Sequence, residues 1–108
     1  MVEHIRLQND NLARILHATL HKRIADFCDQ YTPEIPGDIV AAAWLKRLFD
    51  GDQNIYIVVS LDNTYNITGH LVADIQDAFG YKVLNCHQVQ GEKNSVEALN
   101  LGAEYLDK

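Results

Sequence analysis

The segment that decides the fold reads Ile55-Tyr56-Ile57-Val58-Val59-Ser60-Leu61. It is rich in β-branched and aromatic residues and nearly free of polar ones, which is typical of a central strand with both faces covered. It lies in a chain of 108 residues, a length that suits one domain, because smaller pieces could not bury a useful core. We therefore expect a single domain over residues 1–108, built around a sheet that contains this strand.

Two further strands are predicted directly after this segment. Asp62-Asn63-Thr64 has the composition of a turn. Apolar and polar residues then alternate from Ile67 to Gln76, which is a strand pattern with a polar face. The run Leu71–Phe79 can also be interpreted as a short helix. Phe79-Gly80 predicts another turn, and Tyr81–Val89 a further strand, so the sheet is expected to be mainly antiparallel.

Two helices are predicted before the central strand. Asn9-Asp10-Asn11 supplies N-cap side chains, and apolar residues then recur at helical spacing as far as Tyr31. The two prolines of Thr32–Pro36 end this helix. Asp38 can cap a second helix, which Asp50-Gly51 would end with a left-handed glycine. The expected apolar stripe of the first helix comprises Leu12, Ile15, Leu16, Leu20, Ile24, Phe27, Cys28 and Tyr31.

The two ends of the chain complete the expected order of elements. Val2–Leu7 predicts a short first strand. Asn94, with Glu97 three residues later, fits a capping box that opens a last helix over Ser95–Asp107. The prediction is an α/β (α+β) fold in the order β-α-α-β-β-β-α, with helices covering a mainly antiparallel sheet.

Charge and hydropathy exclude several classes of protein. A net charge of −6 and a pI near 5.1 argue against a phosphate-binding surface, so no nucleic-acid partner is expected. No apolar run approaches the ~20 residues that span a bilayer, so no membrane partner is expected. The N-terminus lacks the pattern of a signal peptide, and we expect a cytoplasmic protein.

Cysteine and histidine spacing gives little sign of reactive or metal-binding groups. Cys28 and Cys86 form no CxxC motif, which favours reduced, packed thiols over a nucleophile. His17 and His21 are four residues apart and could share one metal ion, but no third ligand follows by spacing. We therefore expect no metal site.

Three segments carry a resemblance to a known family. They are Ile67-Thr68-Gly69-His70-Leu71-Val72-Ala73-Asp74-Ile75, Lys82-Val83-Leu84-Asn85-Cys86-His87-Gln88-Val89, and the predicted helix Ser95–Asp107. Together with the order of elements, they resemble the third strand, the fourth strand and the acetyl-CoA-binding helix of the GNAT-type N-acetyltransferases. That family usually continues beyond this helix, so the resemblance implies a GNAT-like fold without its C-terminal third.

The resemblance also implies a cofactor site. In the family, the fourth strand is bulged and its backbone holds the pantetheine arm of acetyl-CoA, while a glycine-rich loop and a helix N-terminus bind the pyrophosphate. The corresponding cofactor-binding positions here are Gln88, Val89, Gly91, Lys93, Asn94 and Ser95. The loop Gln90–Ser95 keeps only one glycine of the family pattern and includes the acidic Glu92. A plain capped helix start is therefore the alternative interpretation.

One histidine is the main candidate for catalysis. Acetyl transfer to an amine needs a base that removes a proton from the ammonium group. His87, on the predicted fourth strand, suits this role because imidazole is partly neutral near pH 7. His70 and Asp74, on one face of the adjacent strand, are the second candidates. In the resembled family, a connection such as Tyr31–Pro36 borders the acceptor pocket.

Two hypotheses for function follow. The first is a GNAT-like N-acetyltransferase that uses acetyl-CoA as co-substrate and a small-molecule or protein amine as acceptor. The second is a non-catalytic GNAT-like module that binds a protein partner or serves in an assembly. A bulge near Cys86–Gln88 would favour the first and a regularly paired strand the second. Under either, an uncovered sheet edge predicts a homodimer, a larger homo-oligomer or a partner that covers the edge.

Overall fold

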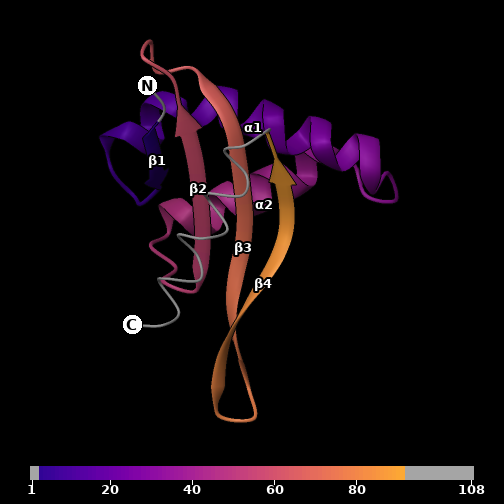
Figure 1. The fold of residues 1–108 in the computed structure, drawn as a ribbon. Helices are drawn as coiled ribbons and strands as arrows, with labels where there is room; N and C mark the ends of the chain where they lie inside the picture. Colours follow the sequence, from indigo (N-terminus) through magenta and orange to yellow (C-terminus); the bar gives the residue numbers. More distant parts are fainter. Residues whose placement is uncertain (1–2, 92–108) are drawn as a thin grey trace. The chain divides into compact units, whose positions relative to one another are not determined.

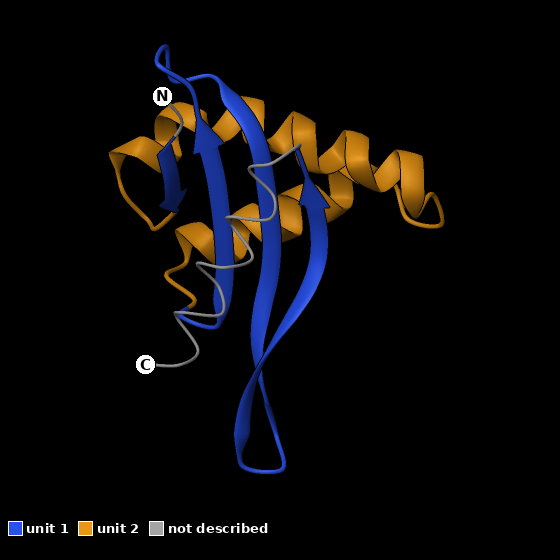
Figure 2. Ribbon diagram, in the orientation of Figure 1, with its two compact units in different colours: residues 1–6, 53–108 blue, residues 7–52 orange. Residues whose placement is uncertain are grey.

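A computed structural model describes residues 3–91, which fall into two compact units (Figures 1 and 2). Unit 1 takes its described residues from 3–6 and 53–91, and unit 2 comprises residues 7–52. The helix predicted over Ser95–Asp107 lies outside the described residues. The single domain predicted over residues 1–108 stays a prediction.

Unit 1 is an antiparallel sheet, as predicted. Within the described residues its strand order is β1-β2-β3-β4. The strands are β1 (Glu3–Arg6), β2 (Ile55–Leu61), β3 (Ile67–Ala78) and β4 (Tyr81–Gln90). The helical interpretation of Leu71–Phe79 is wrong, because nearly all of this run pairs within the sheet.

The apolar residues of β2 are buried along the whole strand, as their lack of alternation predicts. Tyr56 and Val58 form a cluster on one face with Leu71 and Ala73 of β3, against which Leu84 and Val89 of β4 pack. The opposite face of β3 was predicted to be polar. Two of its residues, His70 and Val72, are instead fully buried. Alternation of polar residues therefore located the strand correctly but not its solvent exposure.

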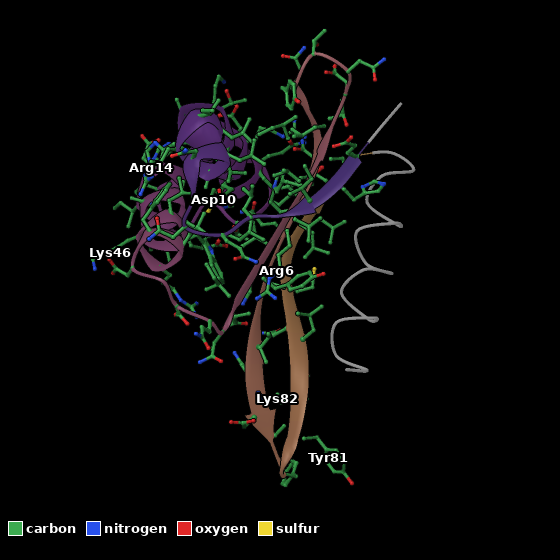
Figure 3. All side chains as sticks on the ribbon, turned by 90° about the vertical axis from the view of Figure 1, so that its left-hand side faces the viewer. Arg6, Asp10, Arg14, Lys46, Tyr81 and Lys82 are labelled. Atoms are coloured by element: carbon green, nitrogen blue, oxygen red, sulfur yellow. The ribbon has the colours of Figure 1, made fainter. Side chains whose placement is uncertain are left out.

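Past Ile55, the first residue of β2, the sheet narrows to a ribbon of β3 and β4 alone (Figure 1). The last rung shared with β2 joins Asp74 to Ile55. Phe79 and Gly80 form the two-residue turn, with φ values of 53° and 83°. Positive φ at both central residues defines a type I′ turn, a geometry that a bulky residue rarely adopts. Phe79 is nevertheless there and is fully exposed. Tyr81, which follows the turn, lies at the tip of the ribbon (Figure 3).

Unit 2 consists of α1 (Asn11–Tyr31) and α2 (Gly37–Phe49). Asp10 caps α1 as predicted, because its Oδ1 accepts a hydrogen bond from the amide of Ala13 at 3.1 Å. The predicted stripe is partly wrong. Ile15 and Tyr31 are 75% and 61% exposed. Successive helix residues are rotated by about 100°, so a buried face centred on Leu16, Leu20 and Ile24 turns Ile15 outward.

The start of α2 packs against the backbone of α1. The amide of Gly37 donates to Asp29 Oδ1 at 2.8 Å, so a carboxylate of α1 satisfies the first amide of α2. The prediction that Asp38 caps this helix is wrong, since Pro36 holds the N-cap position and Asp38 lies in the first turn. Gly51 has φ 79° and so adopts the predicted left-handed conformation. Neither α1 nor α2 is long and apolar enough to cross a membrane.

Gly37→Ala should destabilise the protein by about 3 kcal/mol, at the upper end of the range for overpacking. A Cβ at this position would lie 2.2 Å from the carbonyl oxygen of Ala25, which is backbone and cannot swing aside. Gly51→Ala is the matched control: it has φ 79° but open space around it, and should cost about 1 kcal/mol. Urea unfolding measures both values. A Gly37→Ala variant no less stable than Gly51→Ala would contradict the close approach.

Candidate functional site

A β-bulge interrupts the pairing of β3 with β4. Val72 lies opposite Gln88, whereas the next residue of β3, Ala73, lies opposite Cys86. His87 is therefore an extra residue of β4 with no Cα partner on β3. Bulges bend the strand, increase its twist and are over-represented next to active sites. A bulge near Cys86–Gln88, the feature that distinguishes the two functional hypotheses, is thus present, with His87 at its centre.

The bulge changes which face of the sheet each residue of β4 occupies. In a regular strand, Leu84 and Val89 would point to opposite faces, because they are an odd number of residues apart. Both nevertheless pack against the cluster around Tyr56 and Val58. The extra residue at His87 makes this possible, since it exchanges the two faces between Cys86 and Gln88.

Gln88 forms a buried hydrogen bond with His70. Gln88 Oε1 lies 3.0 Å from His70 Nε2, and the two residues are only 5% and 2% exposed. The amide oxygen can only accept, so Nε2 of His70 carries the proton. Val89 packs against the apolar cluster. The side chains of Gln88 and Val89, two of the predicted cofactor-binding residues, are therefore engaged inside the sheet. A cofactor would therefore meet these two residues through their backbone, as the resemblance implies.

His87 points to two polar side chains beside the bulge. Its Nε2 lies 3.0 Å from Asp74 Oδ1 and 3.4 Å from Asn85 Nδ2. Asp74 and Asn85 are opposite one another in the β3–β4 register. The His87 side chain is 39% exposed and that of Asp74 14%. Two of the three residues on which catalysis was predicted, His87 and Asp74, therefore meet at one place on the sheet.

The structure rearranges the second pair of candidates. His70 and Asp74 were the second candidates, on one face of β3; His70 bonds to Gln88, whereas Asp74 bonds to His87. Sequence reasoning missed Asn85. Its spacing of two residues from His87 could have indicated a shared face, although the bulge alters that relation and no local signal marks the bulge.

The remaining predicted positions are placed only in part. Gly91 follows β4 with φ 121°, a conformation that favours glycine. The predicted pyrophosphate-binding residues Lys93, Asn94 and Ser95 lie outside the described residues. The connection Tyr31–Pro36 belongs to unit 2, and its role beside an acceptor stays a prediction. No group of three or more metal-ligating side chains occurs among residues 3–91.

Both cysteines are free, but only one is packed as predicted. Cys28 is buried, whereas Cys86 is an exposed residue. Neighbouring groups still cover part of the Cys86 side chain, and this burial raises the pKa of its thiol. A raised pKa leaves less thiolate at neutral pH, so the environment does not activate Cys86 as a nucleophile.

Comparison with solved structures identifies the fold. The aminoglycoside acetyltransferase HMB0005 from an uncultured soil metagenomic sample matches 97% of this chain over 71% of its own, with a TM-score of 0.63 and 14% identity. A possible acetyltransferase from Clostridium difficile 630 matches 100% of this chain over 72% of its own, with a TM-score of 0.71 and 14% identity. A candidate acetyl transferase from Pyrococcus furiosus gives a TM-score of 0.67 at 10% identity, covering 99% of this chain and 75% of its own.

The chain therefore has the GNAT-like acetyltransferase fold that its sequence resembles. At identities of 10–14%, the likeness shows the fold and does not transfer an activity or a substrate. No protein-family model matches the sequence, and no curated protein matches it closely enough to show a relationship.

Gln88→Leu should destabilise the protein by about 1–3 kcal/mol, because it removes the acceptor from a buried imidazole donor. Gln90→Leu, two residues along on the exposed end of the same strand, should change the stability by less than about 0.5 kcal/mol. Chemical denaturation of both variants measures the difference. Equal effects would show that the His70–Gln88 bond contributes nothing specific.

Alkylation of Cys86 by iodoacetamide should reach half its maximal rate at a higher pH than alkylation of an unstructured peptide with the sequence of residues 84–88. The thiolate is the reactive form, and burial raises the pKa at which it appears. Cys28 is buried and should react only on unfolding, so mass spectrometry of the tryptic peptides separates the two. If the pH profile of Cys86 alkylation coincides with that of the peptide, or lies at lower pH, the raised pKa of Cys86 is contradicted.

Proposed function

We propose that the protein is an acetyl-CoA-dependent N-acetyltransferase whose acetyl-CoA lies along β4 at the His87 bulge. The observation that carries the proposal is the bulge itself, found on the strand where the resemblance expects it, in a chain with this fold. β4 is one of the two edge strands of the sheet formed by residues 3–91. Extended ligands with amide groups, such as pantetheine, can add to such an edge by backbone hydrogen bonds.

The residues beside the bulge suit the protein's part of the reaction. The acceptor amine is an ammonium ion near neutral pH and must lose a proton before its nitrogen can attack. His87 takes this proton, and the amine nitrogen then forms a bond to the acetyl carbon of the thioester as the carbon–sulfur bond breaks. The sulfur leaves with the electron pair. It takes the second proton that the nitrogen releases as the amide forms, and His87 returns its own proton to solvent.

The fit to acetyl-CoA rests on the backbone of β4 rather than on side chains. The side chains of Gln88 and Val89 are engaged within the sheet, so acetyl-CoA would contact this part of β4 through its backbone. Gly91 then turns the chain with a positive φ. The acceptor would be a small molecule or a protein with a free amine.

Acetyl-CoA at 100 times its dissociation constant should stabilise the protein by about 2.7 kcal/mol. For a domain of this size, that stabilisation raises the melting temperature by roughly 10 °C or more. Thermal unfolding with acetyl-CoA, with adenosine diphosphate and without ligand measures the effect. No shift at millimolar acetyl-CoA would sink the proposal and leave the alternative, a non-catalytic module that binds a protein partner.

Two variants separate the bulge from the imidazole. Deletion of His87 places Cys86 and Gln88 in register with Ala73 and Val72 and should restore a regular ladder. His87→Ala keeps the bulge and removes only the base. The deletion should abolish the thermal shift with acetyl-CoA, whereas His87→Ala should keep the shift and lose about 10²–10⁴-fold in acetyl-transfer rate. A deletion variant that binds as well as the original protein would show that the bulge is not the binding feature.

A further inference from the structure

The contacts of His87 Nε2 cannot all form at once. Asp74 Oδ1 is a carboxylate oxygen and only accepts hydrogen bonds, whereas Asn85 Nδ2 is an amide nitrogen and only donates them. In neutral imidazole each ring nitrogen either carries a proton or offers a lone pair. Bonding to Asp74 therefore requires the proton on Nε2, and bonding to Asn85 requires it on Nδ1. The two neighbours select opposite tautomers.

Distance and charge decide between the two neighbours. The 3.0 Å contact with Asp74 lies within the usual range for N–H···O bonds, while the 3.4 Å contact with Asn85 lies beyond it. A hydrogen bond to an ionised acceptor is also about twice as strong as one between neutral groups. His87 therefore donates from Nε2 to Asp74, and its lone pair is on Nδ1.

Asp74 is well placed to act as a fixed anchor. It stands on β3 between Ile55 of β2 and Asn85 of β4, so its backbone lies on a rung that spans three strands. Its other oxygen, Oδ2, accepts a hydrogen bond from Gln76 Nε2 at 3.2 Å. His87, in contrast, has no Cα partner on β3 because it is the bulged residue. The bond to Asp74 ties the bulged side chain to the regular part of the sheet.

We propose that Asp74 is a positioning residue that holds His87 in the Nε2-protonated tautomer and so makes Nδ1 the atom that receives the proton from the acceptor amine. The inference rests on the proposed function for the role of that proton. When Nδ1 takes the proton, both ring nitrogens carry one, and the Asp74 carboxylate stabilises the imidazolium. A neutral residue at position 74 would leave that charge without its partner.

The tautomer can be measured without any acetyl-transfer assay. In ¹⁵N NMR spectra of the neutral imidazole, the protonated and unprotonated ring nitrogens give well-separated signals. The original protein should show a protonated Nε2 on His87. Asp74→Ala leaves Asn85 as the neighbour that can donate to Nε2, so the proton should move toward Nδ1. Asn85→Ala is the matched control and should leave the tautomer unchanged.

The opposite pattern would overturn the inference. A His87 tautomer that responds to Asn85→Ala but not to Asp74→Ala would show that Asn85, not Asp74, sets the ring. A proton on Nδ1 of His87 in the original protein would also overturn the inference. If Asp74→Ala fails to fold, Asp74→Asn keeps the size of the side chain and removes its charge. In the Asp74→Asn variant, His87 should then be a mixture of both tautomers. A single tautomer, unchanged from the original protein, contradicts the inference.

Kinetics separate this inference from the proposed function. Asp74→Ala should lower kcat by up to the factor lost in His87→Ala and leave KM for acetyl-CoA unchanged. It should cause no further loss in a protein that already carries His87→Ala, because both act through one imidazole. Gln76→Ala, which removes the amide that donates to Asp74 Oδ2, should have a much smaller effect. If Asp74 sets the tautomer but the protein has no transferase activity, only the proposed function is contradicted. If full activity survives Asp74→Ala, only the positioning role is contradicted.

Discussion

The register between β3 and β4 is the constraint on which the rest of the sheet depends. One extra residue at His87 changes the faces of β4, so that Leu84 and Val89 both reach the apolar cluster while Gln88 reaches His70 on the other face. If the same sequence paired with β3 without a bulge, one end of the strand would have to expose its apolar residues and bury polar ones. The core and the candidate site are therefore consequences of the same insertion.

Much of the fold could be predicted because the signals are local. The apolar run of β2 indicated a strand buried on both faces, and the aspartate of the cap indicated the start of α1. The ends of β3 and β4 followed from turn residues. What these signals share is that each depends on neighbours in the sequence, and the physics of caps, turns and strands acts over the same few residues.

The errors concern long-range contacts. Asp29, on the preceding helix, accepts the hydrogen bond of the first amide of α2, and no pattern around Asp38 could have shown which carboxylate does so. His70, on the predicted polar face of β3, is buried with Gln88 of the neighbouring strand as its hydrogen-bond partner. The bulge has no sequence signature of its own, and the pairing of His87 with Asp74 depends on it. His87 and Asp74 could thus be named as candidates from the sequence, whereas Asn85 and the contacts among the three could not.

The narrow ribbon beyond β2 has a consequence for how the sheet opens. Two-stranded hairpins are marginally stable in water, and this one turns through a bulky residue in a left-handed conformation, so hydrogen exchange should be fastest at its tip. Opening can proceed along the ribbon until it meets the rung of Ile55, Asp74 and Asn85, where a third strand begins. His87 bonds to that same rung. The candidate base therefore lies at the border between the two-stranded ribbon, whose hydrogen bonds open locally, and the three-stranded part of the sheet, whose hydrogen bonds stay formed.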